Sequence, residues 1–264
     1  MNLASKKPIG IFDSGIGGTS IWKEINTLLP NENTIYLADS KNAPYGQKSE
    51  EKILELSIKN TELLLNKNCK LIVVACNTAT TNAIKYLRES YSVPFIGIEP
   101  AIKPASINTK TKKIGVLATK GTLNSRLFTS TSNSIDQGVS IVEQVGDGLV
   151  ELIENGQLVS KEMTLLLNKY LKKLLIEKID HLVLGCTHYP YLIPQIQEIL
   201  GPNITIIDSG RAVAKQTKKV LTKHNILNSE NLKTTHVFYS NTGTKVLNLV
   251  LRKDKKNYVN TLDF

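Results

Sequence analysis

The chain has 264 residues, enough for one large α/β domain or two smaller ones, each with its own hydrophobic core. Hydrophobic residues make up 41% of it, but no run is long enough to span a membrane, and no apolar stretch follows the N-terminal lysines as in a signal peptide. The net charge is +10, but the lysines are scattered and aromatic residues, 6% of the chain, are not interleaved with them, which argues against specific nucleic-acid binding.

Short apolar runs alternate with longer helical patterns along the chain, an order typical of βα units around a parallel sheet. The predicted strands, in chain order, are Pro8–Phe12, Thr34–Leu37, Leu71–Ala75, Phe95–Ile98, Ile114–Ala118, His181–Gly185 and Thr205–Ile207. Two segments place apolar residues at three- and four-residue steps and contain no Pro or Gly, which predicts the amphipathic helices Ser49–Asn66 and Glu162–Ile176. The sequence therefore predicts an α/β fold.

Three strand segments recur in the same order about 105–110 residues later. Ile9–Asp13 resembles Ile114–Ala118, Val73–Thr78 resembles Val183–His188, and Phe95–Glu99 resembles Thr205–Asp208 in pattern. Three matches at nearly one interval indicate a duplication and predict two similar lobes, each a mainly parallel sheet flanked by helices. We place residues 1–98 and 209–264 in the first lobe and residues 99–208 in the second. Open parallel sheets bind ligands at the carboxyl ends of their strands, so we expect an active site in the cleft between the lobes.

The three cysteines do not form a disulfide framework, so we expect free thiols and a cytoplasmic protein. Cys76 and Cys186 each follow a predicted strand at matching points of the repeat, whereas Cys69 is interpreted as a small core residue. A thiol between a strand and a helix start lies beside unpaired backbone N–H groups, so we expect a lowered thiol pKa at Cys76. His188, two residues after Cys186, is a candidate hydrogen-bond partner or proton relay for that region.

Two matched thiols on facing lobes suit the inversion of a carbon centre. Such a reaction is most simply done by a base that removes a proton from one face and an acid that returns one to the other face. A thiolate and a thiol can do this when local electrostatics bring their pKa from about 8.5 towards the working pH. The sulfurs must then lie on opposite sides of the substrate, whereas a redox pair needs sulfurs within bonding distance. No metal is expected, because no pair of candidate ligands has the spacing of a zinc finger.

The run Asp13-Ser14-Gly15-Ile16-Gly17-Gly18 follows the first predicted strand. It lacks the Gly-x-Gly-x-x-Gly pattern of dinucleotide-binding loops and no Walker lysine follows, so nucleotide binding is not expected. We interpret the glycines as positions where the backbone comes close to a small ligand, with Asp13 pointing into the cleft. The alternative is that Asp13 and Ser14 cap a helix that starts near Gly18.

Other polar residues carry weaker signals. The segment Asn42–Gly46 is a turn by composition, and ligand contact is the less favoured alternative there. Thr119 and Thr122 follow the equivalent strand of the second lobe and reach the cleft only if the duplication places them there. The remaining histidines belong to no motif and are interpreted as surface or structural residues: His181, His224 and His236.

Together these motifs resemble the bacterial glutamate racemase family, and the match extends over most of the chain. The landmarks stand in order as Gly10–Gly18, Pro44–Gly46, Ala75–Thr80, Ile114–Thr122, Gly185–Pro190 and Asp208–Gly210. The resemblance implies two α/β lobes with the active site between them, and racemisation of glutamate without pyridoxal phosphate, metal or nucleotide, so we expect no cofactor. It also implies a cytoplasmic supply of D-glutamate for peptidoglycan, and hence for the cell wall and cell shape. We expect the chain to form a homodimer.

The resemblance also implies roles for individual residues. The catalytic set is Cys76, acting on D-glutamate, Cys186, acting on L-glutamate, and the assisting residues Asp13 and His188. The positions that bind substrate, besides Asp13 and His188, are Ser14, Tyr45, Gly46, Asn77, Thr78, Thr122 and Thr187. Glu151 is a further acidic candidate. The segment Phe238–Thr244 departs from the acidic ending expected there, which affects C-terminal packing and leaves the chemistry unchanged.

Three alternatives stay open. A related two-cysteine racemase acts on aspartate or hydantoins, and one methylene in a pocket is worth only about 1–3 kcal/mol. The basic surface, which we interpret mainly as solubilising, would in a second alternative bind nucleic acid or a DNA-processing protein, and that binding would be steeply salt-dependent. The third alternative is a thiol redox protein, which predicts a disulfide between Cys76 and Cys186 on mild oxidation.

Overall fold

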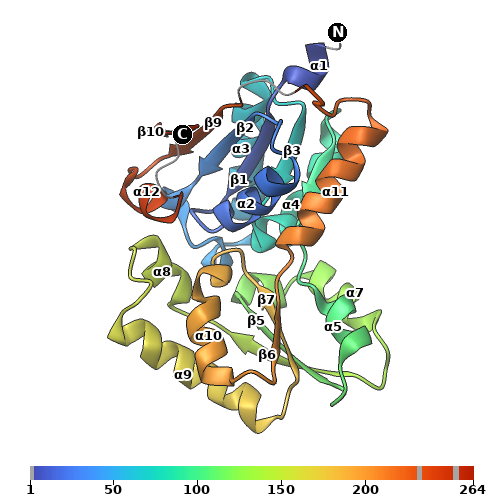
Figure 1. Cartoon of the computed structure of the whole chain (residues 1–264), viewed down its shortest axis with the longest axis vertical. Helices are drawn as coiled ribbons and strands as arrows, with labels where there is room; N and C mark the ends of the chain where they lie inside the picture. Colours follow the sequence, from blue (N-terminus) through green and yellow to red (C-terminus); the bar gives the residue numbers. More distant parts are fainter. Residues whose placement is uncertain (1–2, 231–233, 252–255) are drawn as a thin grey trace.

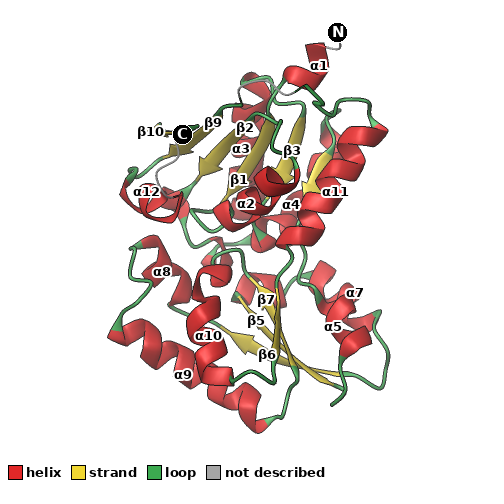
Figure 2. Ribbon diagram, in the orientation of Figure 1, coloured by secondary structure: helices red, strands yellow, loops and turns green. Residues whose placement is uncertain are grey.

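A computed structural model describes residues 3–230, 234–251 and 256–264. The chain forms two α/β lobes stacked one above the other (Figure 1). Each lobe is built around one sheet with helices packed against it (Figure 2). No helix in the described ranges is long and apolar enough to cross a membrane. The predicted fold class, two similar α/β lobes, is confirmed.

In the described residues of the first lobe, the strands pair in parallel in the order β10-β9-β2-β1-β3-β4. Their bounds are β1 Ile9–Asp13, β2 Thr34–Ala38, β3 Leu71–Val74, β4 Phe95–Gly97, β9 His236–Ser240 and β10 Asn257–Thr261. Every residue of β1 and β3 is buried, as expected for central parallel strands covered on both faces. Asp13 therefore ends a buried strand at the carboxyl edge of the sheet.

The helices of the first lobe cover both faces of its sheet. They are α1 Leu3–Lys6, α2 Thr19–Leu28, α3 Glu50–Asn66, α4 Asn77–Ser90, α11 Gly210–Lys223 and α12 Lys245–Leu251, with the 3-10 turns η1 Ser40–Asn42 and η2 Tyr45–Gln47. α2 packs against α11, and α3 packs against α4. Ile11 shares one core cluster with Trp22, while Phe12 shares another with Leu64, because successive strand side chains point to opposite faces.

The second lobe repeats this arrangement on a smaller sheet, with parallel strands in the order β6-β5-β7-β8. The strands are β5 Lys113–Ala118, β6 Ser140–Val145, β7 His181–Gly185 and β8 Thr205–Ile207. The helices are α5 Ile102–Asn108, α6 Lys120–Leu123, α7 Arg126–Asn133, α8 Leu149–Glu154, α9 Lys161–Ile176 and α10 Ile193–Leu200, with the 3-10 turn η3 Tyr189–Leu192. β5 and β7 are central and almost wholly buried, so Cys186 directly follows a core strand.

Every predicted strand and both predicted helices are present, with bounds shifted by no more than one residue. Three strands were not predicted: β6, β9 and β10. β6 and β10 lie at sheet edges, and their residues are half-buried or exposed, so they lack the continuous apolar run of a central strand. β9 alternates buried and half-buried residues next to the β10 edge. Half-exposed strands that contain polar residues therefore escape a search for continuous apolar runs.

The two lobes face each other with the carboxyl ends of their strands. Thr187, just beyond β7, donates a hydrogen bond to Asp13 Oδ1 at the end of β1, over 3.1 Å. The chain crosses between the sheets near Glu99 and again near Ser209, where Ser209 Oγ donates to the Glu99 carbonyl at 2.5 Å. The sheet membership of the strands supports the lobe boundaries proposed above, residues 1–98 with 209–264 and residues 99–208, which remain a proposal.

Candidate active site

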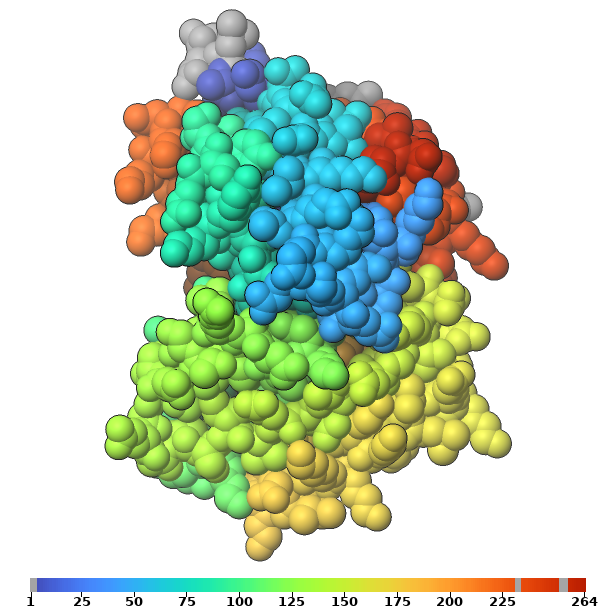
Figure 3. Space-filling view, turned by 180° about the vertical axis from the view of Figure 1, so that it is seen from behind, coloured from blue at the N-terminus to red at the C-terminus, as the bar shows by residue number. Residues whose placement is uncertain are grey.

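A small cavity between the lobes is lined by both candidate thiols. Both lobes contribute to its lining: Ser14, Pro44, Tyr45, Gly46, Cys76, Asn77, Thr78, Thr119, Val150, Cys186, Thr187 and His188. From behind, the blue surface of the first lobe closes onto the green surface of the second, and η2 and α6 are in contact at this seam (Figure 3). The fold thus brings one cysteine from each lobe to a single cavity.

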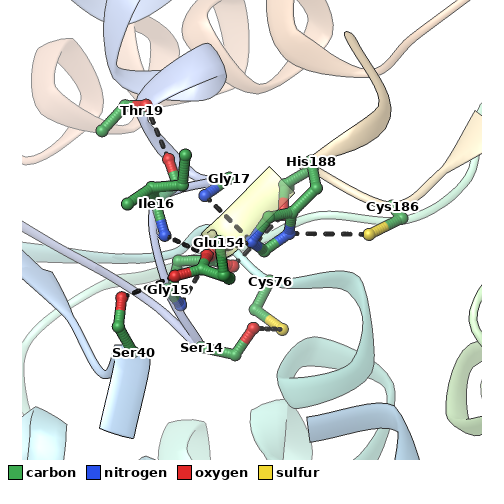
Figure 4. Close-up of polar contacts among 12 residues, drawn as sticks. Ser14, Gly15, Ile16, Gly17, Thr19, Ser40, Cys76, Glu154, Cys186 and His188 are labelled. Atoms are coloured by element: carbon green, nitrogen blue, oxygen red, sulfur yellow. Dashed lines mark hydrogen bonds and ion pairs between the residues drawn. The ribbon is translucent and has the colours of Figure 1, made fainter. Parts of the chain in front are cut away.

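Cys76 follows β3 and caps the N-terminus of α4. Its Sγ accepts a hydrogen bond from the backbone N of Ala79 at 3.4 Å and lies 3.7 Å from Ser14 Oγ (Figure 4). Burial first, and then the charge of Asp13, outweigh these contacts and raise the pKa of Cys76 well above its usual range. The expected lowering of this pKa by the helix N-terminus is therefore wrong. Cys76 is held as a protonated thiol.

Asp13 is fully buried behind the cavity lining. Its Oδ2 accepts a hydrogen bond from the backbone N of Gly15, and its Oδ1 accepts one from Thr187 Oγ1, both at 3.1 Å. Burial raises the pKa of Asp13 to about 6, although His188 and the backbone N–H groups favour the carboxylate. Gly18, the residue before α2, has no side chain to cap the helix, and the backbone N–H groups of Gly15 and Gly18 both favour the Asp13 carboxylate. A role at the start of α2 and a role at the cavity therefore hold together for Asp13, which reaches the cavity through Thr187.

His188 joins Cys186 to a buried carboxylate. Its Nδ1 lies 3.7 Å from Cys186 Sγ, and its Nε2 lies 2.5 Å from Glu154 Oε1. Burial opposes a charged imidazole, but the hydrogen bonds to Cys186 and Glu154 and the nearby carboxylates outweigh it and raise the pKa of His188 well above its usual value. An imidazolium donates from both ring nitrogens. One N–H then faces the Cys186 sulfur and stabilises negative charge there.

Glu154, at the end of α8, was not predicted from the sequence. Its Oε1 also accepts from the backbone N of Ile16, and its Oε2 accepts from Ser40 Oγ, both at 2.7 Å. Burial opposes its charge, but the hydrogen bond and charge of His188 and these donors outweigh burial and lower the pKa of Glu154. The predicted acidic candidate, Glu151, lies one turn earlier and accepts instead from Gln47 Nε2 at 2.7 Å. Glu154 is thus the carboxylate that contacts His188.

The glycines of the first loop allow this interlobe contact. A Cβ on Gly15 would overlap the carboxylate of Glu154, and a Cβ on Gly17 would overlap the imidazole of His188. The backbone N of Gly17 lies 3.3 Å from His188 Nε2, so it can donate only when that nitrogen carries no proton. The glycines were expected to admit a small ligand. In the structure, they admit two side chains of the other lobe (Figure 4).

Three of the threonines near the cavity form a hydroxyl cluster between the lobes. Thr78 Oγ1 lies 2.9 Å from Thr119 Oγ1 and 3.3 Å from Thr122 Oγ1, so hydroxyls of the two lobes form one cluster. Thr122 lies behind the lining, fully buried. Asn77 lines the cavity, and among the described residues neither polar atom of its side-chain amide has a hydrogen-bond partner. A buried amide without partners is costly, so Asn77 is a strong candidate to bind a polar ligand.

Tyr45 and Gly46 form the remaining wall of the cavity. Tyr45 is 1% exposed, and its hydroxyl donates to Asp39 Oδ2 at 2.5 Å while it accepts from Asn60 Nδ2 at 3.1 Å. This hydroxyl is therefore engaged inside the first lobe. A Cβ on Gly46 would lie 2.9 Å from Thr119 Cβ, so glycine lets η2 approach the second lobe closely. The turn thus lines the cavity and also contacts the second lobe.

The other histidines are confirmed as surface or structural residues. His236 is buried against Trp22 and lies 3.0 Å from Thr34 Oγ1. His181 Nδ1 lies 2.8 Å from Asp180 Oδ1, and His224 is exposed. Cys69 is buried, and burial raises its pKa to about 12, as expected for a core thiol.

Two similar α/β lobes that close around one thiol from each lobe form the architecture of a two-lobed racemase. The chain belongs to the Asp/Glu/Hydantoin racemase family, whose model matches residues 9–217. It is 46% identical over 224 residues to a glutamate racemase of Herpetosiphon aurantiacus, which covers 85% of this chain and 88% of that protein. Its fold is similar to glutamate racemase from Bacillus anthracis (TM-score 0.88, 32% identity, 98% of each chain). It is also similar to the Francisella tularensis enzyme in complex with D-glutamate (TM-score 0.85, 28% identity, 98% of each chain).

Proposed function

We propose that this protein is a glutamate racemase that interconverts L- and D-glutamate by proton transfer at Cα between two thiols, without a cofactor. One observation carries the proposal: Cys76 and Cys186, from different lobes, line the same cavity. The glutamate racemases among its relatives, and the D-glutamate bound to the Francisella tularensis enzyme, support glutamate as the substrate. The proposed product serves peptidoglycan synthesis in the cytoplasm.

In the L-to-D direction, the Cys186 thiolate removes the α-proton of L-glutamate, and the Cys76 thiol delivers a proton to the opposite face. One C–H bond breaks and one forms, so neither charge nor oxidation state changes overall. The His188–Glu154 pair supports this starting state, because an imidazolium N–H faces the Cys186 sulfur. The raised pKa of Cys76 supports the complementary thiol on the other face.

In the reverse direction, Cys76 is the base and D-glutamate is the substrate. Its thiolate is stabilised by the backbone N–H of Ala79 and the hydroxyl of Ser14. We assign Asp13 an assisting role, because its pKa of about 6 lies close to neutral pH and its charge raises the pKa of Cys76. A protonation change at Asp13 would therefore change how readily Cys76 ionises.

The cavity lining offers donors for the carboxylates and amine of the substrate. We propose that Asn77 binds the substrate with its free amide, and that the groups around it complete the site: Ser14, Tyr45, Gly46, Thr78 and Thr187 in the lining, and Thr122 behind it. Direct hydrogen bonds such as that between Thr187 and Asp13 join the lobes over this cavity. The lobes must therefore separate to admit glutamate and close again around it.

The test follows the circular dichroism of L-glutamate and of D-glutamate with the purified enzyme. Both signals should decay to zero, and dialysis against a chelator should not change the rate. A substrate panel with aspartate and hydantoins separates the related racemases, and a clear preference for either would overturn the assignment. Counting thiols before and after mild oxidation tests the redox alternative, which requires loss of both cavity thiols together.

Two further expectations belong to this proposal. A homodimer is proposed, and sedimentation equilibrium would show it as twice the chain mass. A protein that stays monomeric at working concentration would contradict the dimer and leave the racemase assignment intact. The absence of a specific nucleic-acid partner predicts only weak DNA binding that disappears at moderate salt.

A further inference from the structure

A tyrosine behind the active site connects the two lobes. Tyr191 lies in η3, three residues after His188, and it does not belong to the described residues that line the cavity. Its Oη lies 2.5 Å from Oγ1 of Thr19, the first residue of α2 in the other lobe. Tyr191 therefore lies outside the cavity lining, but it contacts the helix that follows the glycine loop.

This contact closes a ring of hydrogen bonds around His188. Thr19 Oγ1 donates to the carbonyl of Ile16 at 2.6 Å, and the backbone N of Ile16 donates to Glu154 Oε1 at 2.7 Å. Glu154 Oε1 lies 2.5 Å from His188 Nε2, and the backbone N of Tyr191 donates to the carbonyl of His188 at 3.2 Å. The ring crosses between the lobes twice, at Ile16–Glu154 and at Thr19–Tyr191. Both crossings form only when the lobes are closed.

The direction of the Thr19–Tyr191 hydrogen bond is fixed by its neighbours. The hydroxyl hydrogen of Thr19 is used towards Ile16, so Tyr191 is the donor to Thr19. Burial raises the pKa of Tyr191 to about 12, so the phenol keeps its hydrogen throughout the neutral range. Lys23 Nζ lies 3.5 Å from Tyr191 Oη and 4.8 Å above the ring centre, which holds the phenol in place.

We propose that Tyr191 and Thr19 are positioning residues for proton transfer at Cys186: they hold the Ile16 turn against Glu154 and thereby keep the His188 imidazole directed at the Cys186 sulfur. The inference rests on the proposed racemase function. Small displacements of an acid–base group cost large factors in rate, so loosening this ring should slow the step that uses Cys186. The contacts of Cys76 with Ser14 and Ala79 lie outside the ring. The effect should therefore be confined to one of the two proton transfers.

The central variants are Tyr191→Phe, which keeps the ring packing and removes the donor, and Thr19→Val, which removes the acceptor. We expect kcat/KM to fall about tenfold in each. The fall must be equal for both enantiomers, because they have equal free energy. The double variant should be no worse than either single variant, because both break the same link. Thr19→Ser keeps a hydroxyl and should restore activity, and Tyr86→Phe, on an exposed tyrosine of α4, is the matched control.

Isotope effects distinguish positioning from general loss of structure. With Cys186 acting on L-glutamate, a slower Cys186 step increases the deuterium isotope effect on kcat/KM for α-deuterated L-glutamate. It decreases the effect for α-deuterated D-glutamate, because the Cys76 step then limits the reaction less. Isotope effects that stay unchanged, or activity within a factor of about two of wild type, would overturn the inference. A wild-type protein that fails to racemise glutamate would instead overturn the proposed function, before any variant is compared.

Discussion

The surroundings of the two thiols differ more than the repeat suggests. Cys76 lies near a buried carboxyl, Asp13, and among the described residues its sulfur makes polar contacts with one hydroxyl and one backbone N–H. Cys186 faces an imidazole that is backed by a second carboxylate, Glu154. Burial and the charge of Asp13 therefore favour the neutral thiol at Cys76, whereas the Cys186 sulfur has an imidazole nitrogen 3.7 Å away. Two equivalent strands have thus acquired opposite electrostatics.

This difference matches the needs of a reaction that requires one acid and one base at the start. Two identical sides would both prefer the thiol or both prefer the thiolate, and the productive state would then be a minority. The difference between the surroundings of the two thiols depends on contacts between the lobes. Glu154 contacts the glycine loop of the first lobe, and Asp13 contacts Thr187 of the second. Closure of the lobes therefore completes the surroundings of both thiols together.

The largest expected effect comes from removing either thiol. Cys76→Ala and Cys186→Ala should each lower racemisation by at least about a thousandfold, because one face loses its proton donor or acceptor. Exchange of the substrate α-hydrogen for deuterium in D₂O, followed by NMR, separates the two thiols. Cys76→Ala keeps Cys186 and should exchange the α-hydrogen of L-glutamate only. Cys186→Ala keeps Cys76 and should exchange the α-hydrogen of D-glutamate only. Racemisation at the normal rate in either variant would refute the two-thiol mechanism.

The next largest effect is expected at the glycine loop. Gly17→Ala places a methyl group on the His188 imidazole, so the lobes should no longer close over Cys186. We expect kcat/KM to fall about a hundredfold in a protein that remains folded by circular dichroism. Gly138→Ala is the control, because its Cβ would meet its nearest neighbour, Asp136, at an ordinary 3.5 Å. Equal activity in the two variants would show that this close approach is not needed.

Asp13 provides a pH-dependent test of the Cys76 side. Burial raises the pKa of its carboxyl from 3.8 to about 6, so the native state binds this proton more tightly than the unfolded state. The protonated Asp13 carboxyl stabilises the native state fully below about pH 4, and this stabilisation is lost as the pH rises through about 6. The shift in pKa corresponds to a loss of about 3 kcal/mol in the free energy of unfolding. Asp13→Asn should therefore raise the free energy of unfolding at pH 7 by up to about 3 kcal/mol and flatten its dependence on pH.

Urea unfolding between pH 4 and 7 measures this effect on stability. The racemase activity of the same variant should fall about tenfold or more. The outcome combines a more stable protein with a poorer catalyst, which is typical of a group buried for function. A variant that is less stable than wild type at pH 7 would show that the hydrogen bonds from Gly15 and Thr187 outweigh the cost of burying the charge.

The smallest effect is expected at Ser40, on the Cys186 side. Ser40→Ala removes the hydrogen bond to Glu154 Oε2, while Ile16 and His188 still hold Oε1. We expect kcat to fall about two- to fivefold, with little change in KM, because the serine does not touch the substrate cavity. Steady-state kinetics measure kcat and KM for this variant and for the control Ser134→Ala, which changes an exposed serine with a local hydrogen bond. A change confined to KM would assign Ser40 to substrate binding instead.

The sequence by itself determined the central strands and the placement of both thiols. Central parallel strands are buried on both faces, so β1, β3, β5 and β7 appear as continuous apolar runs, and the residues just beyond them reach the carboxyl edge of each sheet. The repeat then predicted that Cys76 and Cys186 face one cleft. The sequence carries this information because a strand that is buried on both faces must consist mainly of apolar residues, and such a run can be recognised without its neighbours.

Only the tertiary structure decided which groups surround those thiols. Glu154 is 34 residues from His188 and 138 from Ile16, and its neighbours in α8 are buried aliphatic residues that give no sign of its partners. The pKa of Cys76 was predicted with the wrong sign, because a helix N-terminus can be read locally but the burial and the charge of Asp13 cannot. Desolvation and Coulomb interactions act through space, and they depend on how two distant lobes meet.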